Sequence, residues 1–102
     1  MDDAVFVALA APARRQLLER LAMGPTSATG LATTFPLTRQ AVVKHLGALA
    51  DAGMVAKERH GREVHYRLEQ APLDAATDWL ATLSARWERR LLRLKSYVED
   101  QP

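Results

Sequence analysis

The chain has 102 residues, no cysteine and a formal net charge of +2 at pH 7. This length predicts one domain spanning 1–102, and the lack of cysteine excludes disulfides, thiolate metal sites and cysteine nucleophiles. With 48% hydrophobic and 25% charged residues, the composition is that of a folded chain. The sequence contains no apolar run of 18 residues and no signal-peptide pattern, so we expect a cytoplasmic protein without a membrane partner.

Two short helices are predicted at the start of the chain. Phe6 marks the first, and Pro12 opens the second, because proline is tolerated in the first turn of a helix. Gly24 ends the second helix. Arg15 lies in its first turn, where positive charge is unfavourable. This arginine is either solvated or contacts a phosphate or carboxylate.

The segment of about 26–53 is predicted to form a helix-turn-helix. Ser27 can cap a short helix over 28–34, which Phe35 and Pro36 end. Thr38 caps the next helix, and Gly53 stands where a C-terminal stop is expected. Two short helices joined by so few residues are typical of this motif.

The helix that follows Thr38 has two different faces. Val42, Leu46 and Leu49 recur at i, i+4 and i+7 and predict a buried stripe. The remaining face carries Arg39, Gln40, Val43, Lys44 and Gly47. Arginine, glutamine and lysine near the start of a short helix suit a DNA major groove. The alternative is the solvated face of an ordinary core helix.

A basic hairpin is predicted over 54–68. Val64, Tyr66 and Leu68 alternate with polar residues, as in a half-buried strand, and Gly61 supplies a tight turn before Arg62. Residues 35–67 carry six basic and three acidic residues, so the excess positive charge coincides with the amphipathic helix. The pattern predicts a wing beside a helix-turn-helix, with its tip on a minor groove or on phosphate.

A long helix is predicted over 73–99, after a segment 70–72 that closes the hairpin. Apolar residues follow one another at spacings of three and four along it, which is nearly a heptad seam. They are Ala76, Leu80, Leu83, Trp87, Leu91, Leu94 and Val98. Because the helix is longer than a small core can cover, we expect part of the seam to face a second subunit. The alternative is a lid over the first helix of the same chain.

These segments together resemble the arsenic-repressor (ArsR) family of winged helix-turn-helix transcriptional regulators. The resemblance covers about residues 5–68, and the long helix fits in placement. It rests on an A-L-A-x-P-x-R-R opening at 8–15, the segment 37–46 with its His-Leu pair, and the wing at 61–68. Ala11 and Ala13 stand where the family has Asp and Thr, so contacts made by those side chains are missing here.

The resemblance implies a mainly α fold with a two-stranded β wing and a symmetric dimer built from the first and last helices. It also implies a palindromic operator and repression released by an inducer, here an unidentified small molecule. The expected dimer-interface residues are Val5, Phe6, Leu9, Leu80, Leu83, Trp87, Leu91 and Leu94. The expected DNA-binding residues are Thr38, Arg39, Gln40, Val43, Lys44, His45, Lys57, Arg59 and Arg62.

Metal sensing and catalysis are not predicted. The histidines are His45, His60 and His65, and the long helix has none, so three or four converging ligands are not expected. We expect His45 to pack under its helix or bond a phosphate, and His65 to be exposed. No nucleophile with a His-Asp arrangement and no glycine-rich phosphate loop occurs, so we expect no cofactor and no enzyme. The alternatives are a protein-interaction module and a metal-responsive repressor with an unrecognised site.

Overall fold

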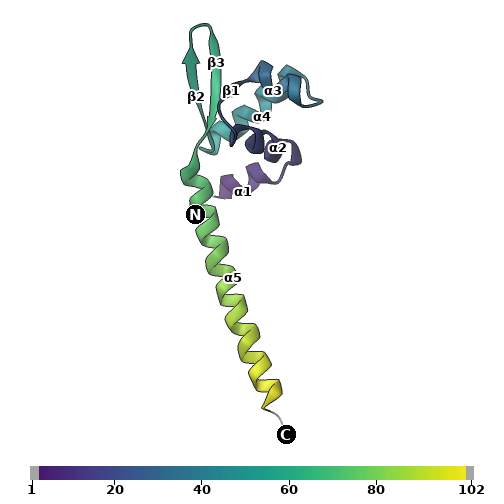
Figure 1. Ribbon diagram of the computed structural model, residues 1–102, viewed down its shortest axis with the longest axis vertical. Coiled ribbons are helices and arrows are strands. Elements are labelled where there is room, and N and C mark those ends of the chain that lie inside the picture. Colours follow the sequence, from purple (N-terminus) through teal and green to yellow (C-terminus); the bar gives the residue numbers. More distant parts are fainter. Residues whose placement is uncertain (1–2, 101–102) are drawn as a thin grey trace.

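The computed structural model describes residues 3–100 as a small head from which one long helix projects (Figure 1). The molecule measures 73 × 25 × 22 Å. The elements in chain order are α1 (Asp3–Leu9), α2 (Pro12–Leu21), β1 (Thr26–Ser27), α3 (Ala28–Thr34), α4 (Arg39–Asp51), β2 (Val55–His60), β3 (Glu63–Leu68) and α5 (Gln70–Glu99). This architecture confirms the predicted mainly α fold with a β wing.

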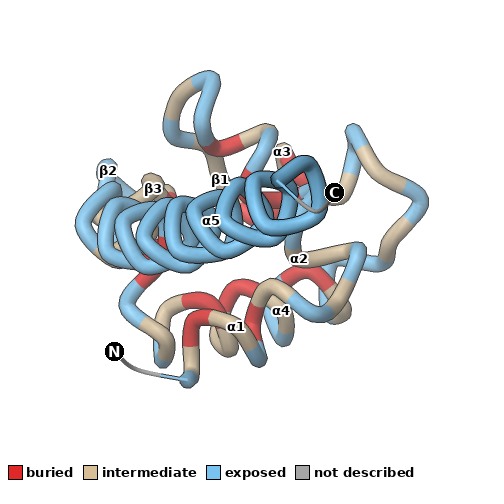
Figure 2. Tube along the Cα trace, turned by 90° about the horizontal axis from the view of Figure 1, so that it is seen from below, coloured by how far each residue is buried: buried red, intermediate tan, exposed pale blue. Residues whose placement is uncertain are grey.

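The core of the head lies between α2, α3 and α4. Its fully buried side chains are Leu17, Leu31, Val42, Leu46, Leu49 and Met54. Each buried side chain of this size contributes about 1.5–3 kcal/mol relative to leaving it in water. Figure 2 shows the buried positions gathered in the head, while α5 is exposed along nearly its whole length.

Both ends of α4 are built from local hydrogen bonds that its sequence specifies. The Thr38 side chain accepts a hydrogen bond from the Ala41 amide at 3.1 Å, which confirms the predicted N-cap. At the other end Gly53 has φ +75°, and the Met54 amide donates to the Leu49 carbonyl at 2.9 Å. This Schellman geometry requires a left-handed residue, which glycine adopts without steric cost.

The wing is part of a three-stranded antiparallel sheet in the order β1-β3-β2, whereas the sequence predicted two strands. The extra strand β1 pairs Thr26 with Tyr66 and Ser27 with His65. Two residues carry no readable strand pattern, and β1 forms only because α3 begins beside β3. The short strand fixes the hairpin to the head, which an isolated hairpin needs.

The long helix begins at Gln70, three residues before its predicted start. The prediction that 70–72 closes the hairpin was wrong because Pro72 falls within the first turn of α5. The first N–H groups of a helix have no intrahelical partner, so a proline there removes no hydrogen bond. The helix therefore starts almost directly after β3.

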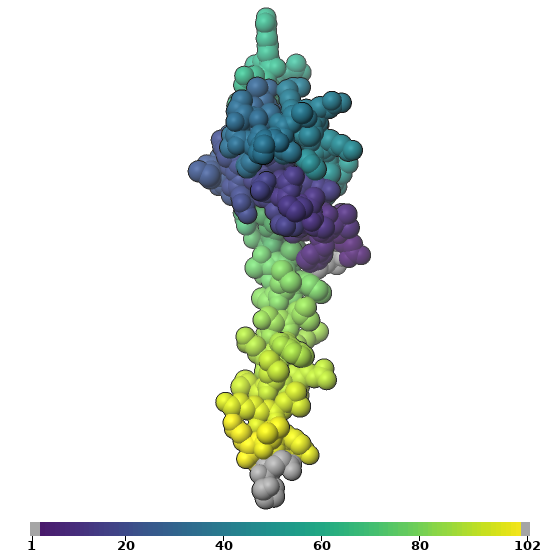
Figure 3. Space-filling view, turned by 90° about the vertical axis from the view of Figure 1, so that its right-hand side faces the viewer, coloured from purple at the N-terminus to yellow at the C-terminus, as the bar shows by residue number. Residues whose placement is uncertain are grey.

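Contact between α5 and the head is limited to the beginning of the helix. Phe6 of α1 meets Trp79 edge-on, with ring centroids 5.5 Å apart, and Ala76 is the buried residue of α5. Beyond this contact α5 forms a narrow stem below the head (Figure 3). The alternative that the long helix forms a lid over α1 therefore holds only for the first turns of α5.

The Arg15 side chain forms hydrogen bonds with the C-terminal end of α1. Its guanidinium donates to the Leu9 and Ala10 carbonyls at 2.7 and 3.2 Å. These carbonyls are among those that a helix C-terminus leaves without intrahelical partners. The position of Arg15 at the start of α2 thus has a structural reason within the chain.

Candidate nucleic-acid interface

The first turn of α4 presents three of the predicted DNA-binding side chains to solvent. Thr38 is exposed although its hydroxyl oxygen caps the helix. The Arg39 Nε donates to the Thr29 hydroxyl at 3.2 Å, so this guanidinium leans toward α3. Gln40, the next residue of the helix, is also exposed. A hydrogen bond between α3 and α4 thus orients one of the basic side chains.

The next turn continues the same exposed face. Val43 is 39% exposed and Lys44 is exposed, and both line an open, shallow surface together with Gln40. His45 is half-buried, because it lies between this face and the buried stripe. The partition of α4 into a buried stripe and an exposed face agrees with the predicted periodicity.

A groove of about 340 Å³ separates the start of α4 from the wing. Arg39 and Val43 line it from α4, and Arg62, Glu63 and Tyr66 line it from the hairpin. Two guanidinium groups therefore stand on opposite walls of one open groove. A groove with a cation on each wall suits an anionic backbone, because arginine pairs with phosphate through several donors.

The other two wing residues predicted to bind DNA share one of its faces. Antiparallel pairing sets Lys57 opposite Tyr66 and Arg59 opposite Val64, and directly opposed residues project to the same side of a sheet. Tyr66 is buried against the head, so Lys57 and Arg59 lie on the face that includes the groove. Arg62 follows Gly61, which has φ +64° in the turn.

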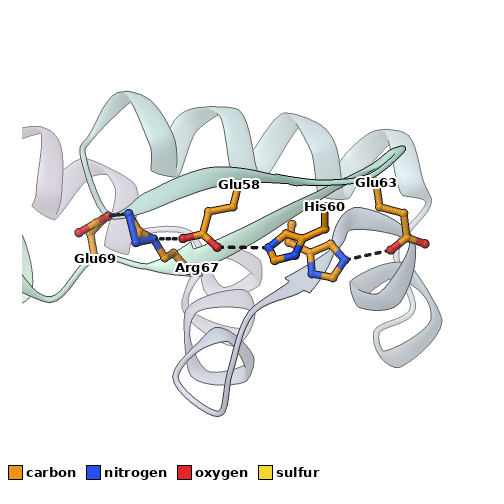
Figure 4. Close-up of polar contacts among 6 residues, drawn as sticks. Glu58, His60, Glu63, Arg67 and Glu69 are labelled. Carbon is orange, nitrogen blue, oxygen red and sulfur yellow. Dashed lines mark hydrogen bonds and ion pairs between the residues drawn. The ribbon is translucent and has the colours of Figure 1, made fainter.

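The other face of the wing holds a polar network that the sequence did not predict (Figure 4). It consists of Glu58, His60, Glu63, His65, Arg67 and Glu69. His65 is half-buried rather than exposed, because its ring stacks on His60. A two-residue turn at Gly61 and Arg62 sets Glu58 opposite His65, and this signal was present in the sequence.

The residues predicted at a dimer interface divide into two groups. Val5 is 5% exposed, and Phe6 and Leu9 are partly buried against the same core. These three side chains pack mainly against the core of their own chain. The seam residues of α5 are 45–56% exposed, and they are Leu80, Leu83, Trp87, Leu91 and Leu94.

Residues 3–100 hold neither a candidate metal site nor a candidate membrane span. This part of the chain contains no group of three or more histidine, aspartate or glutamate side chains arranged to hold a metal ion. None of its helices combines the length and the apolar character needed to cross a membrane.

Comparison with known proteins decides the family. The chain is 34% identical to the HTH-type transcriptional regulator Rv2034 of Mycobacterium tuberculosis over 97% of its length and 90% of the relative. Its structure is similar to that of an ArsR-like transcriptional regulator from Rhodococcus sp. RHA1, with a TM-score of 0.86, 38% identity and coverage of 97% and 91% of the two chains. The chain belongs to the ArsR family of transcriptional regulators.

Two further similarities support this membership. A family model described as a helix-turn-helix domain matches residues 9–58. The chain is also 29% identical to the transcriptional repressor SdpR of Bacillus subtilis, over 74% of this chain and 84% of the relative. The ArsR family binds DNA and regulates transcription, so the predictions of a DNA-binding regulator and of a protein that is not an enzyme are confirmed.

Proposed function

We propose that this ArsR-family protein is a homodimeric repressor that binds a palindromic operator in the cytoplasm. The observation that carries the proposal is the groove between α4 and the wing, which has Arg39 and Arg62 on opposite walls. Both walls belong to elements that winged helix-turn-helix proteins present to DNA. The similarity to a relative named as a transcriptional repressor supports repression rather than activation.

In this proposal α4 enters the major groove by its N-terminal half. Gln40 pairs with adenine, Val43 contacts a thymine methyl group, and Arg39 binds guanine or a phosphate. Thr38 and Lys44 face the same major groove, and His45 packs under the helix or bonds a phosphate. The exposure of Gln40 and Val43 supports their role as readers of base edges.

The wing holds the neighbouring backbone or minor groove. Arg62 projects from the turn, and Lys57 and Arg59 stand behind it on the groove side of the hairpin. Contacts to phosphate carry no sequence information, so these residues supply affinity and register.

A second copy of the chain is the partner that we propose for α5. The exposed seam includes Trp87 at 56% and Leu83 at 50% exposure, an apolar surface that a soluble monomer rarely leaves in water. Two copies related by a two-fold axis then present two copies of α4 to half-sites about one helical turn apart, roughly 34 Å.

The charges of α5 support pairing in the antiparallel direction. Residues 70–85 contain Asp74 and Asp78 and no lysine or arginine. Residues 86–95 contain five basic residues and one acidic residue. Antiparallel pairing sets the acidic half of one α5 beside the basic half of the other, whereas parallel pairing sets like charges together.

The proposal is tested with DNA from upstream of the protein's own gene. In a gel-shift titration with footprinting, a repressor dimer protects two symmetric half-sites in a salt-sensitive complex. A protein-interaction module that kept the fold gives no specific complex. Adding zinc or nickel to the bound complex tests the metal-responsive alternative, which predicts metal-dependent release. Release by a small organic molecule instead identifies the inducer.

A further inference from the structure

Two histidines and their acidic partners lie on the outer face of the wing, which we define as Glu58, His60, Glu63, His65, Arg67 and Glu69. Glu58 lies opposite His65 and His60 opposite Glu63 in the antiparallel register, so all four project to the same side. The basic residues Lys57 and Arg59 project to the other side. The two faces of one hairpin thus have different charge.

The histidine rings are held in a defined arrangement (Figure 4). Their centroids are 4.5 Å apart with an interplanar angle of 29°. The His60 Nε2 lies 3.3 Å from a Glu58 oxygen, and the His65 Nε2 lies 2.9 Å from a Glu63 oxygen. Glu58 is itself fixed by Arg67 Nε at 2.9 Å. Each ring is therefore stacked on the other and tied to its own carboxylate.

Neutral rings leave this face negative. A carboxylate can only accept hydrogen bonds, so each Nε2 carries a hydrogen and each Nδ1 is the site where a further proton binds. Arg67 also pairs with Glu69 at 3.0 Å. With neutral histidines the three glutamates and Arg67 sum to −2, and with two imidazolium rings the sum becomes zero.

The network lies close enough to the wing tip for this change to reach bound DNA. His60 and Arg62 are two residues apart, so their Cα atoms are at most about 7.6 Å from one another. This separation is shorter than the Debye length of roughly 8–10 Å at physiological salt. No residue of β1, which adds Thr26 and Ser27 beside His65, contributes a charge.

We infer that the stacked pair His60 and His65 makes the affinity of the wing for DNA depend on pH. The inference rests on the proposed DNA-binding function and names a regulation of that same site. Histidine is the side chain that ordinarily changes charge between pH 5 and 8. With both rings protonated the outer face carries no net negative charge, and the phosphate backbone is repelled less.

The test measures binding to a mixed-sequence 30-base-pair duplex at pH 5.8 and pH 7.8 at equal ionic strength. The electrostatic contribution is independent of sequence, so no operator is needed. We expect the wild-type protein to bind about three- to tenfold more tightly at pH 5.8, as two charges near the surface allow. Binding that is absent at both pH values contradicts the proposed function. Binding that is equal at both contradicts only the present inference.

Two variants assign the effect to these residues. The double substitution His60→Gln and His65→Gln removes the titrating groups, and its affinity should no longer change between the two pH values. The double substitution Glu58→Gln and Glu63→Gln removes the negative charge, and it should bind at pH 7.8 about as tightly as wild type at pH 5.8. Circular dichroism melts establish that each variant is folded. A histidine variant that keeps more than half of the wild-type pH dependence overturns the inference, because the dependence then comes from His45 or elsewhere.

Discussion

Side chains at the start of α4 divide into those that hold the helix and those that are free. Thr38 caps the helix through its oxygen, and Arg39 is tied to Thr29. Within residues 3–100, the side chain of Gln40 makes no hydrogen bond or ion pair. An exposed amide with free donors and an acceptor is suited to bidentate pairing with adenine, because it loses no internal partner on binding.

Replacing Gln40 with alanine should therefore weaken operator binding by about 1–3 kcal/mol and relax specificity at one base pair. Selection from a randomised operator library measures both effects. Arg62→Ala serves as the comparison, because a phosphate contact carries no sequence information. This variant should weaken binding to all sequences and reduce the salt slope by about one. An unchanged selection profile for Gln40→Ala would remove this residue from base reading.

Two glycines inside helices show how the surroundings of an element override its propensity. A Cβ added at Gly30 of α3 would collide with the Thr26 hydroxyl of β1, whereas a Cβ added at Gly47 of α4 meets nothing within 4 Å. Both glycines cost their helices up to about 1 kcal/mol relative to alanine. Of the two, only Gly30 is required by packing, because β1 approaches α3 closely at this position.

Gly47→Ala and Gly30→Ala form a matched pair for thermal or denaturant unfolding. We expect Gly47→Ala to raise the free energy of unfolding by roughly 1 kcal/mol from helix propensity. Gly30→Ala should lower it by about 1–3 kcal/mol, because the added methyl group displaces Thr26 and disturbs the β1 pairing. Stabilisation by both substitutions would contradict the packing of β1 on α3.

The whole molecule is a head with a stem, and the stem cannot be stabilised by its own chain. The head buries its apolar residues between α2, α3 and α4, while α5 leaves its seam exposed beyond the contact of Phe6 with Trp79. In the proposed dimer a second copy of the chain covers this seam. The acidic first half and the basic second half of α5 favour antiparallel pairing of the two helices.

Trp87→Glu should therefore convert the dimer into a monomer in sedimentation equilibrium, because it buries a charge within the proposed interface. Leu92→Glu is the matched control: Leu92 is also exposed, at 64%, but it lies outside the seam. We expect the control to remain dimeric. Loss of the dimer in both variants, or in neither, would show that the seam is not the interface.

The sequence by itself determined which helices form, the caps of α4 and the division of α4 into two faces. Thr38, Gly53 and the spacing of Val42, Leu46 and Leu49 act through neighbours within four residues, so their effect does not need the rest of the molecule. The resemblance also identified the family before any comparison. The DNA-binding and dimer-interface residues that the sequence named remain predictions.

Only the tertiary structure decided the features that join distant segments. The β1 strand and the groove between Arg39 and Arg62 each depend on how separate elements pack against one another. Such contacts depend on where whole helices and strands pack, and the local sequence pattern does not specify that. The sequence thus specified the parts of this regulator, and long-range packing determined which of their side chains meet.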